Sequence, residues 1–299
     1  MKLGLGTVQF GTNYGITNER GQVPLAEVRE ILAKAEKHGF TYLDTAALYG
    51  TSEQVIGKCL PNQNPFKIIT KTLSLNKDVI SKEDVEAIQL RFEASLTHLC
   101  QERIYALLFH NPNDLLSLNA EWLFDFVQKL KKDGKVAQIG VSIYQRNQIE
   151  EILKRFPIDL LQFPVNVLDQ RLTVDDFLSN LHQKGIELHG RSAFFQGILL
   201  SPLDKLPSFL NPLSKTLDSY GQFLIKNKMS RLEAALKFIS TLELDALILG
   251  TTSLTEFEEI IQAWKKLPNI HLNQKDFGPF AFNDQQLLDP SSWPKVTAS

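Results

Sequence analysis

The chain has 299 residues, 43% of them hydrophobic, which is enough for two ordinary domains or for one α/β barrel. Its 34 acidic and 32 basic residues give a net charge of −2 without a long basic run, so nothing favours a nucleic-acid or membrane partner. The N-terminus lacks a signal-peptide pattern and no apolar stretch reaches the roughly 18 residues of a membrane span, so we expect a cytoplasmic protein. Two cysteines are too few for a disulfide framework.

Short apolar runs alternate with helical patterns along almost the whole chain. Between the runs, stretches such as 25–39 and 82–99 repeat apolar residues at helical spacing, and a last one, 255–267, follows the eighth run. Eight strands with helical segments between and after them predict a single-domain (β/α)₈ TIM barrel over residues 1–299, since a doubly wound sheet usually has fewer strands. The predicted strands are 3–7, 41–46, 66–72, 104–110, 136–142, 159–165, 186–193 and 245–251.

Two segments exceed what a barrel needs. Residues 200–229 are longer than a normal connection and hold a helical pattern of their own, and long loops of this kind often cover a site. The tail from about residue 268 either covers the substrate or lies apart from it, and the sequence leaves both open.

Four polar residues fall near the ends of neighbouring predicted strands, where the active site of such a barrel collects. Asp44 lies near the end of the second strand and Tyr49 in the loop after it, while Lys71 and His110 lie near the ends of the third and fourth. Each has an ordinary reading by itself, such as a helix cap, a packing residue or a hydrogen-bonded core histidine. Neighbouring strands would bring all four together.

These four side chains suit carbonyl chemistry. A buried Lys71 needs a counter-charge, and Asp44 can supply it. A cation beside a phenol favours phenolate, so we expect the Tyr49 pKa to be lowered enough for proton donation near neutral pH. His110 can orient a carbonyl oxygen by hydrogen bonding. Together they predict a site that polarises a carbonyl or a carbinol.

The segments GLGTVQFG, LDTAALYGTSEQVIG, IITK and LLFH, in that order and with those separations, resemble the aldo-keto reductases over about residues 1–267. The resemblance implies a barrel that binds NADPH, less often NADH, without a Rossmann domain, and that reduces aldehydes or ketones. It also implies that Asp44, Tyr49, Lys71 and His110 form the catalytic tetrad, with Tyr49 as the general acid.

The same resemblance implies where the cofactor lies. Ser142 and Gln162 match residues that hold the nicotinamide carboxamide, and Arg191 stands where an aromatic residue usually stacks on the ring. Glu256 stands where members that favour NADPH commonly carry Arg, and Gly250 replaces a frequent Lys, so we predict that NADH is used at least as well as NADPH. The predicted cofactor residues are Gly6, Thr7, Ser142, Gln162, Arg191, Ser192, Ala193, Phe194, Gln196, Gly197, Gly250, Thr251, Thr252, Ser253, Glu256 and Glu259.

The substrate side is predicted from four residues, Val8, Phe10, Leu73 and Asn111. With few aromatic walls and Asn111 available for hydrogen bonding, a small carbonyl substrate that is hydroxylated, such as a sugar derivative, is expected. A different reading is a nucleotide-sensing subunit with little turnover, resembling potassium-channel β subunits. A metal-dependent hydrolase would need clustered ligands, so no metal site is predicted; the oligomeric state stays open.

Overall fold

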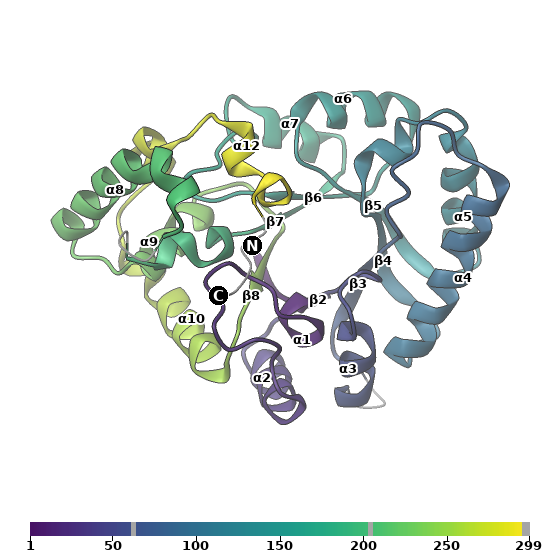
Figure 1. Ribbon diagram of the computed structural model, residues 1–299, viewed down its shortest axis with the longest axis horizontal. Coiled ribbons are helices and arrows are strands. Elements are labelled where there is room, and N and C mark those ends of the chain that lie inside the picture. The colour runs from purple at the N-terminus through teal and green to yellow at the C-terminus, as the bar shows by residue number, and fades with distance from the viewer. Residues whose placement is uncertain (61–63, 203–205, 295–299) are drawn as a thin grey trace.

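The computed structural model describes residues 1–60, 64–202 and 206–294. Within these ranges, parallel strands close into a barrel in the order β1 to β8, and helices surround them (Figure 1). The predicted (β/α)₈ barrel is confirmed, because each strand overlaps its predicted run. The strands are β1 (Lys2–Gly6), β2 (Tyr42–Asp44), β3 (Lys67–Lys71), β4 (Ile104–Phe109), β5 (Val136–Ser142), β6 (Leu160–Pro164), β7 (Glu187–Arg191) and β8 (Ala246–Gly250).

The helices α2, α4 and α10 are those predicted at 25–39, 82–99 and 255–267. The described helices are α1 (Val8–Gly11), α2 (Leu25–Lys37), α3 (Ser52–Cys59), α4 (Lys82–Leu99), α5 (Ala120–Lys132), α6 (Arg146–Arg155), α7 (Phe177–Gln183), α8 (Ser214–Asn227), α9 (Arg231–Ser240), α10 (Leu254–Lys266), α11 (Gln274–Phe277) and α12 (Gln285–Leu288). Short 3₁₀ turns are η1 (Pro112–Leu115), η2 (Phe195–Leu200), η4 (Ser208–Leu213), η5 (Leu267–Asn269), η6 (Gly278–Phe280) and η7 (Pro290–Ser292). No helix in the described ranges is long and apolar enough to cross a membrane.

Side-chain alternation along the strands divides the apolar residues into two clusters. On β3, Ile68 joins the large core that includes buried residues of the surrounding helices. The next residue, Ile69, joins a small separate cluster with Leu108 of β4 and Ile248 of β8. Because Lys71 follows Ile69 by two residues, it faces the barrel interior at the end of its strand.

The predicted helical pattern within 200–229 corresponds to η4 and α8, although residues 203–205 lie outside the described ranges. The tail packs against this segment. Phe280 contacts Tyr220 of α8 with ring centroids 5.3 Å apart. Further on, the Trp293 ring lies 5.2 Å from Phe195 and 5.6 Å from Phe209. The tail therefore packs against the loop after β7, the segment that precedes α8 and α8 itself.

Candidate active site

A cavity of about 600 Å³ lies where the strands end. Five of its lining residues are the last residues of their strands, namely Gly6, Asp44, Ser142, Arg191 and Gly250. Parallel strands end at the same rim of a barrel, so residues distant in the chain meet there. No described residue of the tail lines this cavity.

A buried ion pair underlies the cavity. Lys71 Nζ donates to both carboxylate oxygens of Asp44 at 2.8 Å and to the carbonyl oxygen of Thr45 at 2.9 Å. Gln162 Nε2 donates to Asp44 Oδ1 at 2.8 Å, so the carboxylate has a second partner. Lys71 is 1% exposed and Asp44 is 4% exposed. The pairing expected from the sequence is present, and it balances two charges that would be costly to bury singly.

Tyr49 and His110 lie together in the cavity, beside this pair. Their rings meet edge to face, with centroids 5.9 Å apart and planes at 84°. Lys71 Nζ lies 5.1 Å from the centroid of the Tyr49 ring. The backbone N–H of His110 donates to Thr72 Oγ1 at 3.3 Å, while its ring Nδ1 is buried without a hydrogen-bond partner among the described residues. The structure thus brings the four predicted tetrad residues together.

Two glycines hold the turn that carries Tyr49. Gly50 has φ +56°, in the left-handed region that favours glycine, and a β-carbon there would lie 2.4 Å from the Gly11 carbonyl oxygen. A β-carbon on Gly11 would in turn lie 1.9 Å from the Tyr49 carbonyl oxygen. The two backbones touch directly, so the loop after β2 is fixed against α1. This is why the run DTAALYG places a phenol at the rim.

Burial dominates the ionisation of the site. It raises the pKa of Tyr49 above its ordinary value, and the Asp44 carboxylate raises it further, while Arg191 opposes both. The prediction that this pKa is lowered is therefore wrong, because desolvation of the phenolate and the Asp44 carboxylate together outweigh the effect of Arg191. Burial also lowers the Lys71 pKa, against the pull of Asp44. Burial, Lys71 and Arg191 lower the pKa of His110 to about 4, so its imidazole is neutral at pH 7.

Most of the predicted cofactor residues line the same cavity. The loop after β7 is tied to the loop after β1, because Gln196 Oε1 accepts from the Ile16 N–H at 3.2 Å and the Gln196 carbonyl accepts from Thr17 Oγ1 at 3.0 Å. Gln162 lies behind the lining and is fully buried. The predicted residues in the lining are Gly6, Thr7, Ser142, Arg191, Ser192, Ala193, Phe194, Gln196, Gly197, Gly250, Thr251, Thr252, Glu256 and Glu259.

The start of α10 forms the other end of the cavity. Ser253 does not line it; its hydroxyl caps the helix by accepting from the Glu256 N–H at 3.0 Å. The Glu256 carboxylate accepts from the Thr252 N–H at 2.7 Å. The Thr252 N–H at this helix start is therefore already bound by the carboxylate of a side chain.

Of the four predicted substrate residues, Val8 lines the cavity and the other three do not. Phe10 is fully buried in the large core, and Leu73 packs against it. Asn111 donates to Asn76 Oδ1 at 2.9 Å and to Asp114 Oδ1 at 3.2 Å. Hydrogen bonds to the loop after β3 and within the turn after β4 therefore use the amide that was expected to meet the substrate.

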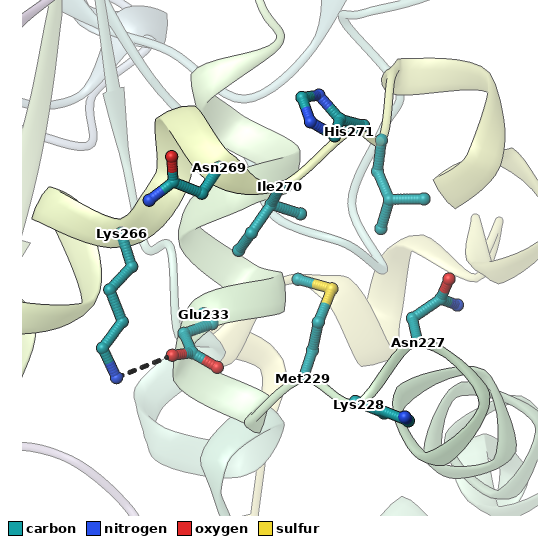
Figure 2. Close-up of a pocket in the computed structure, with 9 residues that line it drawn as sticks. Asn227, Lys228, Met229, Glu233, Lys266, Asn269, Ile270 and His271 are labelled. Carbon is teal, nitrogen blue, oxygen red and sulfur yellow. Dashed lines mark hydrogen bonds and ion pairs between the residues drawn. The ribbon is translucent and has the colours of Figure 1, made fainter.

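Another hollow, of about 410 Å³, lies among the end of α8, the start of α9 and the segment after α10 (Figure 2). Two of its charged groups pair with each other, because Lys266 Nζ lies 3.2 Å from Glu233 Oε1. None of its described lining residues has a buried polar atom without a partner, so it offers no comparable chemistry. No group of three or more His, Cys, Asp or Glu residues in the described ranges could hold a metal ion.

The profile of the Aldo/keto reductase family matches residues 2–277. The chain belongs to this family. It is 31% identical over 175 residues to glyoxal reductase of Bacillus subtilis (strain 168), a match that covers 58% of this aldo-keto reductase and 60% of that protein. It is 27% identical to aldo-keto reductase YhdN of the same strain, over 52% of that protein. These matches therefore span less than two thirds of the relatives' own lengths.

Longer alignments are more distant. L-galactose dehydrogenase of Arabidopsis thaliana is 24% identical over 311 residues, covering 98% of this aldo-keto reductase and 92% of that protein. Among solved structures, aldo-keto reductase AKR11C1 from Bacillus halodurans in its holo form superposes with a TM-score of 0.74 at 20% identity, over 95% of this chain and 94% of that one. At this identity the likeness supports the fold alone.

Sequence reasoning missed several lining residues of this aldo-keto reductase. Tyr14 follows β1 and Tyr144 follows β5, and both line the cavity with Gln9, Thr17 and Leu200. Their positions in the sequence could have identified them as lining residues, because both tyrosines lie in loops that leave the C-terminal ends of predicted strands.

Proposed function

We propose that this aldo-keto reductase transfers hydride between NADH or NADPH and the carbonyl or alcohol group of a small substrate. The observation that carries the proposal is the position of Tyr49, whose ring lies 5.9 Å from the His110 ring and 5.1 Å from Lys71 Nζ. A phenol beside a neutral imidazole and a charge-balanced ammonium suits proton transfer to a carbonyl oxygen. The tetrad roles of Asp44, Tyr49, Lys71 and His110 belong to this proposal.

The residues at the cavity fit a nicotinamide dinucleotide. Gln162 Oε1 is buried without a partner in the described ranges, which suits an amide N–H such as that of the carboxamide. Ser142 ends the adjacent strand in register with Gln162 and adds a hydroxyl. Gly250 leaves space in the cavity wall beside Gln9, because a β-carbon there would lie 3.2 Å from the Gln9 side-chain amide. Residues 192–197 would hold the pyrophosphate, and the start of α10 would hold the adenosine end.

The reduced nicotinamide supplies a hydride to the carbonyl carbon when it is bound. Tyr49 gives its hydroxyl proton to the carbonyl oxygen, so the C=O π bond breaks, an alcohol forms and the nucleotide is oxidised. Because the Tyr49 pKa is raised, the phenol stays protonated at neutral pH and yields its proton to the developing alkoxide. His110 orients the oxygen with one N–H donor. Lys71 stabilises the negative charge that Tyr49 acquires.

We further propose that NADH is used at least as well as NADPH. Glu256 adds a carboxylate where a 2′-phosphate would lie, and it already holds the Thr252 N–H. Arg20 is a nearby cation, with Nη1 3.2 Å from the Thr252 carbonyl oxygen, but it pairs with Glu27 at 3.2 Å. Its charge is therefore largely balanced. Glu256 and Glu259 both line this end of the cavity.

A small hydroxylated substrate stays part of the proposal. Its support is the small side chain of Val8 in the lining and the similarity to L-galactose dehydrogenase over nearly the whole chain. Asn111 no longer supports it, since its amide donates to Asn76 and Asp114.

The test combines binding with turnover. Full-length protein is titrated with NADH and NADPH by fluorescence, then followed at 340 nm with glyoxal, glyceraldehyde and a panel of aldoses. Saturable nucleotide binding together with substrate-dependent oxidation supports the proposal. Tight nucleotide binding without turnover on any substrate contradicts it and favours the nucleotide-sensing subunit. Absence of nucleotide binding contradicts both functions.

A further inference from the structure

Arg91 contacts the loop that carries Tyr49 from outside the cavity. This arginine lies on α4, and its Nη2 donates to the carbonyl oxygen of Ala47, which lies between Asp44 and Tyr49. The N–H of Ala47 donates to the carbonyl oxygen of Lys71 at 3.5 Å. Both polar backbone groups of Ala47 are therefore bound, one by the strand that carries Lys71 and the other by Arg91.

A buried carboxylate sets the position of Arg91. Glu53, on α3, is 2% exposed, and its Oε2 lies 3.7 Å from Arg91 Nη2. Thr70 Oγ1 donates to Glu53 Oε1 at 2.7 Å, and Ser95 Oγ donates to Oε2 at 3.0 Å. His98 Nδ1 lies 3.8 Å from Oε2. A carboxylate buried in this way needs a cation, and a guanidinium supplies a permanent charge, so the Glu53 carboxylate holds Arg91 beside the loop.

Arg91 and Glu53 connect two parts of the tetrad without reaching the cavity. Thr70 directly precedes Lys71 on β3, so the contacts of Glu53 extend to the strand that carries the ammonium. Neither Arg91 nor Glu53 is among the described residues that line the cavity. They would therefore act on the reaction by holding other residues in place rather than by contact with substrate.

The side chains before Tyr49 offer few apolar atoms to fix the loop by packing. Leu48 is 50% exposed, and Ala46 and Ala47 have side chains of a single carbon. At its other end the loop is held by the close approach of Gly50 to the backbone of α1. Moving a reacting group by about 1 Å can cost about 100-fold in rate. A hydrogen bond at the Ala47 carbonyl, two residues before the phenol, is therefore well placed to set its position.

We propose that Arg91 is a positioning residue for Tyr49, because its bond to Ala47 holds the phenol where proton transfer takes place. This inference rests on the proposed function, in which Tyr49 gives its proton to the carbonyl oxygen. Arg91 itself neither gains nor loses a proton in that reaction. Loss of the guanidinium should therefore slow the chemical step and leave nucleotide binding largely unchanged.

Arg91→Met tests the proposal by comparing turnover with binding. In protein that urea unfolding shows to be folded, we expect kcat to fall about 10- to 100-fold while KM and the NADH dissociation constant change less than about threefold. Arg91→Lys retains a cation with N–H donors, so it should recover part of the loss.

Arg155→Met is the matched control. Arg155 Nη2 lies 2.9 Å from Glu121 Oε1 and 3.5 Å from the Ser117 carbonyl oxygen, so it has the same two kinds of partner as Arg91. Its side chain is 33% exposed, against 28% for Arg91, and it is not among the described residues that line the cavity. This variant should leave kcat close to the wild-type value.

The double variant Glu53→Gln/Arg91→Met covers the case in which Arg91→Met does not fold. It removes both charges, so no carboxylate is left buried without a cation, and it still lacks the donor to Ala47. It should show the same loss of kcat as Arg91→Met.

A folded variant without the guanidinium that keeps kcat within about threefold of the wild type would overturn the inference. Equal losses of kcat and nucleotide affinity would also overturn it, as would an equal loss of kcat in Arg155→Met.

For protein that reduces no substrate, hydrogen exchange over residues 45–51 decides the matter, because the N–H groups of Thr45, Ala47 and Tyr49 are hydrogen-bonded there. Exchange at least about tenfold faster in Arg91→Met than in the wild type and in Arg155→Met would uphold the role of Arg91 in holding the loop, while the proposed function fails. Unchanged exchange would refute the positioning role as well.

Discussion

Replacing Lys71 separates the structural and chemical roles of the buried pair. Lys71→Met removes three contacts of 2.8 to 2.9 Å and leaves the Asp44 carboxylate, 4% exposed, with Gln162 as its remaining described side-chain partner. Breaking a buried pair from one side costs about 3–5 kcal/mol, so we expect the free energy of unfolding to fall by that amount. We also expect kcat/KM to fall roughly 100-fold or more, because Tyr49 loses the cation that stabilises its phenolate.

The double variant Asp44→Asn/Lys71→Met distinguishes the two roles. It removes both charges, so it should recover about half or more of the lost stability while activity stays low. Urea unfolding measures the first effect and nucleotide absorbance at 340 nm the second. Lys67→Met, at the opposite end of the same strand, is a matched control with no carboxylate partner within 4.0 Å among the described residues. Recovery of activity in the double variant would refute the chemical role of Lys71, and an undiminished stability of Lys71→Met would refute the magnitude.

Three further outcomes are expected. The pKa of His110 is about 4 in the folded protein and near 6.5 in the unfolded chain, so its contribution of about 3 kcal/mol to the free energy of unfolding is complete above pH 6.5 and is lost as the pH falls to 4. His110→Gln should therefore make the free energy of unfolding depend less on pH between about 4 and 6.5, and an unchanged pH dependence would contradict this expectation. Glu256→Arg should shift the ratio of the NADH and NADPH dissociation constants at least tenfold toward NADPH. The control Glu258→Arg, on the same helix but outside the cavity, should not shift this ratio, and equal shifts in both variants would contradict the placement of Glu256 beside the 2′-position. Gly50→Ala should cost more stability than Gly134→Ala, because both have positive φ but only Gly50 meets a backbone oxygen at 2.4 Å; equal costs of about 1–2 kcal/mol would show that the contact is unimportant.

The architecture was predictable because local patterns and the barrel agree. Alternation in the third predicted strand already placed Lys71 on the face of Ile69, and strand order placed Asp44 on the neighbouring strand. The pairing of Lys71 with Asp44 followed from the cost of burying a lone charge. These inferences needed only periodicity, strand count and one rule about buried ions.

The predictions that were wrong depended on desolvation and on competing hydrogen bonds, which a sequence does not show. The sequence shows which charges lie near Tyr49, but not that burial of the phenolate outweighs them, so the expected direction of its pKa was wrong. Nor does it show that Asn76, in the loop after β3, and Asp114 would accept from the Asn111 amide. The contact of Arg191 with Tyr144 joins the ends of two strands that are not neighbours, which no local pattern reveals.

The central claim is that Tyr49 donates the proton, and Tyr49→Phe tests it most directly. This change removes the hydroxyl and keeps the ring beside His110 and Lys71. With NADH and a substrate that the wild-type protein reduces, we expect kcat to fall about 10²–10⁴-fold while the NADH dissociation constant changes less than about threefold. Tyr220→Phe, which removes the hydroxyl of a fully buried core tyrosine, is the control for loss of a phenol elsewhere. A loss of activity below about tenfold in Tyr49→Phe would contradict the account.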